Sequence, residues 1–122
     1  MNTWTVEPFK DDRGRNVIAE FLADLRKGAG EKAVAKVLRS IDMLAEFGFE
    51  LPDDALRKVT GTAMWELRTR HAGNQYRILT YNPAGRLFVL LHGILKKDHA
   101  IPESDKAKAE RRMEIDRGRR KS

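Results

Sequence analysis

The sequence predicts an α+β fold in which a helical hairpin packs on one face of an antiparallel sheet. Two segments with apolar residues at helical spacing come first, and three segments with alternating or continuous apolar residues follow. The turn sequences HAGN and NPAG separate these three segments. Helices that precede an antiparallel meander are typical of a two-layer α+β domain. The length of 122 residues fits a single domain over residues 1–122.

The N-terminal half is expected to form one strand and two helices. Alternating polar and apolar residues predict a short strand that ends near Pro8. A helix is then expected to begin after Asn16, a candidate N-cap, and to stop at Gly28. A second apolar stripe predicts a helix over residues 31–47. The resulting hairpin needs a sheet to cover its apolar side.

The C-terminal half is expected to supply that sheet. Gly, Pro and Asp in the connecting segment predict a loop with one helical turn over residues 53–58. Three strands follow, over residues 64–70, 75–81 and 86–96, and the last is apolar on both faces, which predicts an interior position. After Pro102 a weakly amphipathic helix is expected, with residues 118–122 as a flexible tail. The sheet face opposite the hairpin is expected to be open.

Several classes of function are excluded by composition. The chain has no cysteine, which removes disulfides, thiolate catalysis and cysteine-based metal sites. His71, His92 and His99 have no metal-ligand spacing, so neither a metal nor another cofactor is expected. Nucleophile-elbow, P-loop and dinucleotide-binding motifs are absent. The longest apolar run is only five residues, Leu87–Leu91, and the N-terminal residues lack the pattern of a signal peptide. A cytoplasmic protein without membrane association is therefore expected.

The positive charge is concentrated in the three strands. The net charge is +6, and residues 57–97 alone carry +7, from 8 basic and 1 acidic residues. The cations expected to converge on the open face are Arg68, Arg70, Arg77, Lys96 and Lys97. Such a cluster repels itself, so a polyanionic ligand explains it well. The alternative is a solvated face whose arginines pair with Asp53, Asp54 or the C-terminal helix.

An Arg/Lys site that faces phosphate has two possible uses. It can hold a nucleic-acid backbone, or it can catalyse metal-free RNA cleavage through attack of the ribose 2′-OH on the neighbouring phosphate. Cleavage also needs proton transfer, for which Lys97, beside Lys96, and two histidines are the candidates. His92 lies within the apolar third strand, where it is either a core histidine or a base, and His99 lies in a polar loop. The residues alone do not decide between backbone binding and cleavage, or between the structural and catalytic roles of the histidines.

Three motifs together resemble a known family. They are the strand motif WELR, the strand motif QYRIL, and the run LLHGILKKDHAIP that closes the third strand. With LRKVTG before them and an Arg-rich helix after them, they span residues 56–112. This combination resembles the phage-derived HigB-like branch of the RelE/ParE toxin superfamily, and the preceding helical hairpin matches the order of elements in that family.

The resemblance implies a RelE-like fold and a toxin of a type II toxin–antitoxin system. Such a toxin is a ribosome-dependent mRNA endoribonuclease (mRNA interferase) that acts without metal, inhibits translation and arrests growth. By position, Arg77 would contact the phosphate in the transition state, and Arg68 and Lys97 would complete the basic catalytic set. The implied RNA contacts are Arg57, Lys58, Arg70, Lys96 and His99. Several relatives carry a catalytic tyrosine after the last strand, but this chain has none beyond Tyr81, so His92, His99 and Lys97 are the candidate bases.

The resemblance also implies the partners. They are the ribosome, its mRNA and a cognate antitoxin with a helix-turn-helix domain, and DNA would be bound only through the antitoxin complex. Two other functions stay open: a ParE-like inhibitor of DNA gyrase on the same fold, and a noncatalytic nucleic-acid-binding module.

Overall fold

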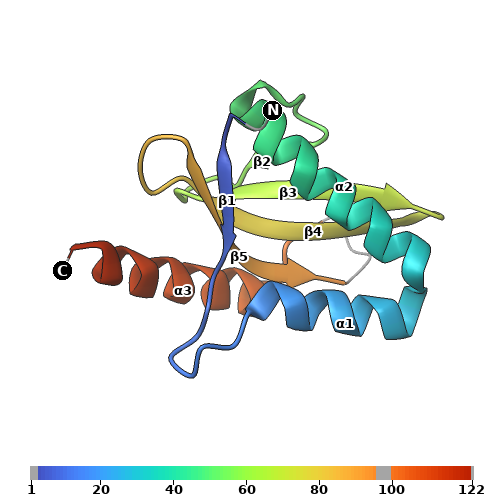
Figure 1. Cartoon of the computed structure of the whole chain (residues 1–122), viewed down its shortest axis with the longest axis horizontal. Coiled ribbons are helices and arrows are strands. Elements are labelled where there is room, and N and C mark those ends of the chain that lie inside the picture. The colour runs from blue at the N-terminus through green and yellow to red at the C-terminus, as the bar shows by residue number, and fades with distance from the viewer. Residues whose placement is uncertain (1–2, 96–99, 122) are drawn as a thin grey trace.

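The computed structural model describes residues 3–95 and 100–121, and these form a five-stranded sheet with three α-helices (Figure 1). The elements are β1 (Thr5–Pro8), α1 (Val17–Ala29), α2 (Glu31–Phe47), the 3-10 turn η1 (Gly48–Glu50), β2 (Leu56–Lys58), β3 (Trp65–His71), β4 (Asn74–Tyr81), β5 (Leu87–Ile94) and α3 (Glu103–Lys121). The predicted α+β class is confirmed. No helix in this part of the chain is long and apolar enough to cross a bilayer.

The strands are ordered β1-β5-β4-β3-β2. β2 to β5 form an antiparallel meander, and β1 adds in parallel beside β5. The interior position predicted for the third long strand is therefore confirmed. The helical turn predicted over residues 53–58 is wrong, because Leu56–Lys58 pairs with Trp65–Leu67 as a strand. Burial of Leu56 opposite Leu67 outweighs the local Gly/Pro/Asp signal.

The helical hairpin forms almost as the sequence predicts. The Asn16 side chain caps α1 by accepting hydrogen bonds from two backbone amides of its first turn. α1 does not stop at Gly28 but continues to Ala29, and the chain turns at Gly30, whose φ of +89° suits glycine. α2 then spans the predicted residues, ends at Phe47 and is followed by Gly48 as its C-cap.

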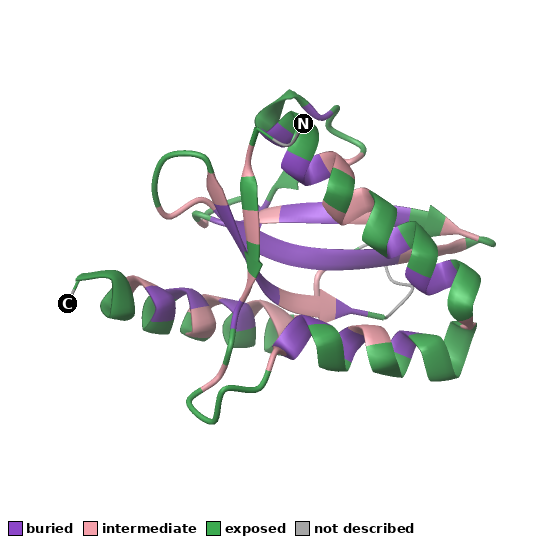
Figure 2. Cartoon of the chain, in the orientation of Figure 1, coloured by how far each residue is buried: buried purple, intermediate pink, exposed green. Residues whose placement is uncertain are grey.

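The hairpin packs on one face of the sheet, as predicted (Figure 1). On α1, Phe21 lies so close to β5 that a Cβ atom added to Gly93 would be 2.2 Å from its ring. On α2, Ser40 accepts a hydrogen bond of 2.7 Å from Thr69 of β3. Figure 2 shows the result as buried stripes on the helices and a β4 that is buried along most of its length.

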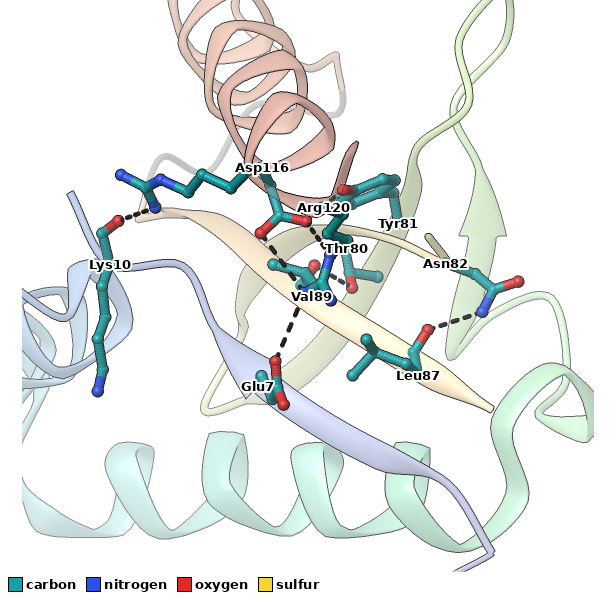
Figure 3. Close-up of polar contacts among 10 residues, drawn as sticks. Glu7, Lys10, Thr80, Tyr81, Asn82, Leu87, Val89, Asp116 and Arg120 are labelled. Atoms are coloured by element: carbon teal, nitrogen blue, oxygen red, sulfur yellow. Dashed lines mark hydrogen bonds and ion pairs between the residues drawn. The ribbon is translucent and has the colours of Figure 1, made fainter. Parts of the chain in front are cut away.

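The opposite face is not fully open, because α3 packs against β5 there. The Tyr81 hydroxyl donates to the buried carboxylate of Asp116, which also pairs with Arg120 at 2.7 Å (Figure 3). Arg120 further approaches Glu7 of β1 at 3.5 Å. Arg119 donates to the Lys10 carbonyl at 2.7 Å. The helix continues past Gly118 to Lys121, across most of the segment that the sequence predicts to be a flexible tail.

Candidate nucleic-acid interface

The register of the sheet places two arginines directly opposite each other. Arg68 of β3 pairs with Arg77 of β4, and Arg57 of β2 pairs with Glu66 of β3. All four side chains lie on the face away from the hairpin, since the alternate residue Thr69 contacts α2. Like charges at directly opposed positions destabilise a sheet. The buried acid Glu66 on the same face offsets part of this repulsion.

Glu66 fixes the position of Arg68. The Glu66 carboxylate lies 2.8 Å from Nε of Arg68, and the two side chains are only 8% and 12% exposed. Nη2 of Arg68 also donates to Gln75 at 3.5 Å. Arg68 therefore pairs with an acid on its own strand, not with Asp53 or Asp54. Sequence reasoning gave Glu66 no role, although it is the single acid among residues 57–97.

Arg77 is completely buried, at 0% exposure. An open cationic surface that includes Arg77 is therefore not what the structure has. Arg77 lies between Arg68 on β3 and Ile94 on β5, on the sheet face against which α3 also packs. Because this guanidinium is buried, a phosphate can contact it only after the structure moves to expose it.

A groove borders Arg68, but the buried Arg77 is not among its lining residues. It lies between β2, β3 and the start of α3, and we call it the arginine groove; it is lined by Arg57, Lys58, Glu66, Arg68, Ile101, Glu103 and Lys106 among others. Arg57 is exposed at its rim. Lys58 is engaged elsewhere, because its ammonium donates to the Thr62 carbonyl and lies 5.5 Å from the centre of the Trp65 ring. Lys106 is a groove cation that sequence reasoning missed, since only the fold brings α3 beside β2.

The remaining predicted residues do not all join this groove. Arg70 is exposed near the end of β3, on the same face as Arg68 but outside the groove lining. The predicted roles of Lys96, Lys97 and His99 fall on residues outside the described part of the chain. Among the described residues, no group of three His, Asp or Glu side chains is placed to hold a metal ion.

His92 joins β5 to α3. Its Nε2 lies 2.7 Å from the Asp105 carboxylate, and its Nδ1 lies 3.0 Å from Nη1 of Arg112. Since arginine can only donate, Nδ1 must accept, and the proton sits on Nε2 facing Asp105. Arg112 also donates to the Leu91 carbonyl at 2.9 Å. Both ring nitrogens are thus engaged in anchoring α3, and neither is presented to the arginine groove as a base.

The pH dependence of stability should report this anchor. The pKa of His92 is lowered, chiefly because burial penalises the imidazolium, and Arg112 and Lys108 add to the effect while Asp105 opposes it. The unfolded chain therefore binds the proton at higher pH than the native protein does. The contribution of His92 is complete above pH ~6.5 and is lost as the pH falls through its native pKa.

Thermal unfolding between pH 8 and 5 measures this contribution. We expect the wild type to lose more stability on acidification than His92→Gln, whose amide can still donate to Asp105. Equal losses in the two proteins would contradict a neutral, anchoring His92.

The fold and this face define a small α+β protein with an arginine-rich groove on the sheet face away from its helical hairpin. Residues 21–114 match the family described as "Phage derived protein Gp49-like (DUF891)". Because this match covers more than half of the chain, the protein belongs to that family. No curated protein matches the chain significantly. The family agrees with the phage-derived part of the resemblance, while membership of the RelE/ParE superfamily stays a prediction.

Proposed function

We propose that the protein is a type II toxin that cleaves mRNA on the ribosome without a metal. The observation that carries this proposal is the opposed pair Arg68–Arg77 beside the arginine groove. A phosphate anion can accept charge-assisted hydrogen bonds from two guanidinium groups placed in this way. Family membership and the α+β fold support the same function.

The proposed reaction is an internal transfer at phosphorus. The ribose 2′-oxygen bonds to the neighbouring phosphorus as its proton leaves, and the bond from phosphorus to the 5′-oxygen breaks. The products are a 2′,3′-cyclic phosphate and a 5′-hydroxyl that takes up a proton. Arg77 and Arg68 stabilise the negative charge that builds up on the phosphoryl oxygens. Arg57 and Lys106 hold flanking phosphates at the rim of the groove.

Four residues are candidates for the proton acceptor: His92, Glu66, Lys97 and His99. His92 is engaged on both ring nitrogens. Lys97 and His99, which lie outside the described residues, stay candidates from the sequence. Glu66 lies in the arginine groove, but it faces Nε of Arg68 at 2.8 Å. We assign it as a positioning residue that holds this guanidinium toward the phosphate.

Glu66→Gln tests this assignment. The amide oxygen can still accept from Arg68, but the charge is lost, so we expect the rate of cleavage to fall about tenfold, which corresponds to ~1.4 kcal/mol. The measurement is single-turnover cleavage of ribosome-bound mRNA as a function of pH. If Glu66 is a positioning residue, its substitution lowers the rate of cleavage at every pH. Loss of the acidic limb of the pH–rate profile would instead show that Glu66 itself accepts the proton. Glu46→Gln, on the exposed side of α2, is the matched control.

The partner and compartment follow from the same proposal. A toxin of this kind acts in the cytoplasm and requires an antitoxin, which we expect to carry a helix-turn-helix domain and to make the contacts with DNA. A short neighbouring reading frame is the first candidate for that antitoxin. Its co-expression should restore growth, and failure of every neighbouring frame to do so would contradict the toxin–antitoxin assignment.

A further inference from the structure

The outer edge of β3 is only partly covered. β2 pairs with Trp65–Leu67, and the Arg68 amide donates to the Ala55 carbonyl at 2.9 Å. In an antiparallel strand the amide and carbonyl of one residue point to the same side, and alternate residues repeat this direction. The Arg68 carbonyl and both main-chain groups of Arg70 therefore point outward. Within the described residues, no strand pairs with them on that side.

A groove runs between this edge and α2, and we call it the edge groove. Its lining includes Lys36, Arg39, Met43, Pro52, Leu67 and Arg70. The floor is apolar, with Leu67 and Met43 contributed by the sheet and the helix. None of the described residues that line it is acidic. The edge groove thus combines an unpaired strand edge, an apolar floor and a positively charged lining.

The cations lie on both sides of the position that an added strand would occupy. Lys36 and Arg39 are exposed on α2, which covers one face of the sheet. Arg70 shares the other face with Arg68 and Arg77, as the register shows. Side chains of a strand alternate between the two faces. Acidic residues on either face of an added strand would therefore meet a cation.

We propose that the edge groove binds an extended, acidic segment of a partner protein, which adds a short strand to β3. Strand addition supplies main-chain hydrogen bonds, and the apolar floor accepts a side chain that faces α2. A single-stranded nucleic acid fits less well, because none of the described residues that line the groove is aromatic and could stack with bases. The edge groove shares Arg68 with the arginine groove. The inference rests on the strand edge and on the cations Lys36, Arg39 and Arg70, so it does not depend on the ribonuclease proposal.

A random library of 12-residue peptides, selected by display against the full-length protein, tests this inference. We expect the enriched peptides to be richer in Asp and Glu and poorer in Pro than the starting library. They should bind the double variant Lys36→Glu/Arg39→Glu at least about tenfold more weakly than the wild type. The control is Lys27→Glu/Arg13→Glu, which makes the same charge change at exposed sites outside the edge groove and should leave binding unchanged.

Two variants of Arg70 test the strand geometry. Arg70→Ala removes the positive charge but keeps the backbone N–H that points away from β4. Arg70→Pro removes both the charge and this N–H, and it leaves the hydrogen bonds between β3 and β4 in place. Arg70→Pro should bind the selected peptides several-fold more weakly than Arg70→Ala, with thermal unfolding confirming that both variants are folded. Three results would each overturn the proposal. They are a selection that enriches no peptides, peptides that bind the Lys36→Glu/Arg39→Glu variant as tightly as the wild type, and equal binding of the peptides by the two Arg70 variants. If a 12-nucleotide oligouridylate loses affinity for the Lys36→Glu/Arg39→Glu variant and no peptide does, the groove binds nucleic acid instead.

Discussion

Replacing Arg77 with alanine is expected to abolish the growth arrest that follows expression of this protein. Arg77 is the proposed principal electrostatic stabiliser of the transition state, and loss of one such group typically lowers a rate by a hundredfold or more, about 3 kcal/mol. Lys97→Ala, suggested by the family resemblance, should weaken the arrest as well. The measurement is growth after induction, together with cleavage of ribosome-bound mRNA by the purified variants.

The complete burial of Arg77 makes a conservative control essential. Arg77→Lys keeps the charge but cannot form the forked contact with phosphate, so it should retain partial cleavage. Circular dichroism and thermal unfolding show whether each variant is folded. A folded Arg77→Ala protein that still cleaves mRNA at the wild-type rate would contradict the proposed role.

Replacing Gly93 with valine is expected to cause the largest loss of stability. Gly93 pairs with Ile78 on the face covered by the hairpin, and a Cβ atom there would lie 2.2 Å from the ring of Phe21. Phe21 is itself buried, at 7% exposure, so the ring and α1 must shift together. Overpacking of this kind costs roughly 3 kcal/mol. Urea unfolding of the purified variant measures the change in the free energy of unfolding.

Gly28→Ala is the matched control for this variant. Gly28 lies within α1, and a Cβ atom added there meets nothing within 4 Å. Alanine is the better helix former, so this variant should gain about 0.5–1 kcal/mol. A Gly93→Val protein as stable as the wild type would show that α1 does not pack as closely on β5 as described.

The sequence predicted the helices and the long strands well, because their signals are local. Asn16 carries the side chain that caps α1, and the period of apolar residues fixed α2 at its observed bounds. β2 was missed for a physical reason. A segment of three residues is too short to show an alternating pattern, and Leu56–Lys58 is a strand only because it pairs with β3. The packing of α3 against the sheet is likewise a long-range feature, and so is the pairing of Asp116 with Tyr81. The weak amphipathicity of the α3 sequence predicts neither contact.

The candidate site was predicted in part. Alternation along the strands correctly placed Arg68 and Arg70 on one face, and the register adds Arg77 to it. The burial of Arg77 was not predictable, because it depends on packing between segments that are far apart in the sequence. His92 could be read from the sequence only as a core residue or a base. The contacts with Asp105 and Arg112, which come from α3, make it an anchor.

Mapping of mRNA 5′ ends after brief expression tests the central claim most directly. The account predicts new ends within translated messages, positioned at the ribosomal A site, that appear with the wild type and are lost with Arg77→Ala. Growth arrest with intact mRNA would contradict the nuclease. If DNA damage signalling and inhibited supercoiling accompanied that arrest, the gyrase alternative would replace it.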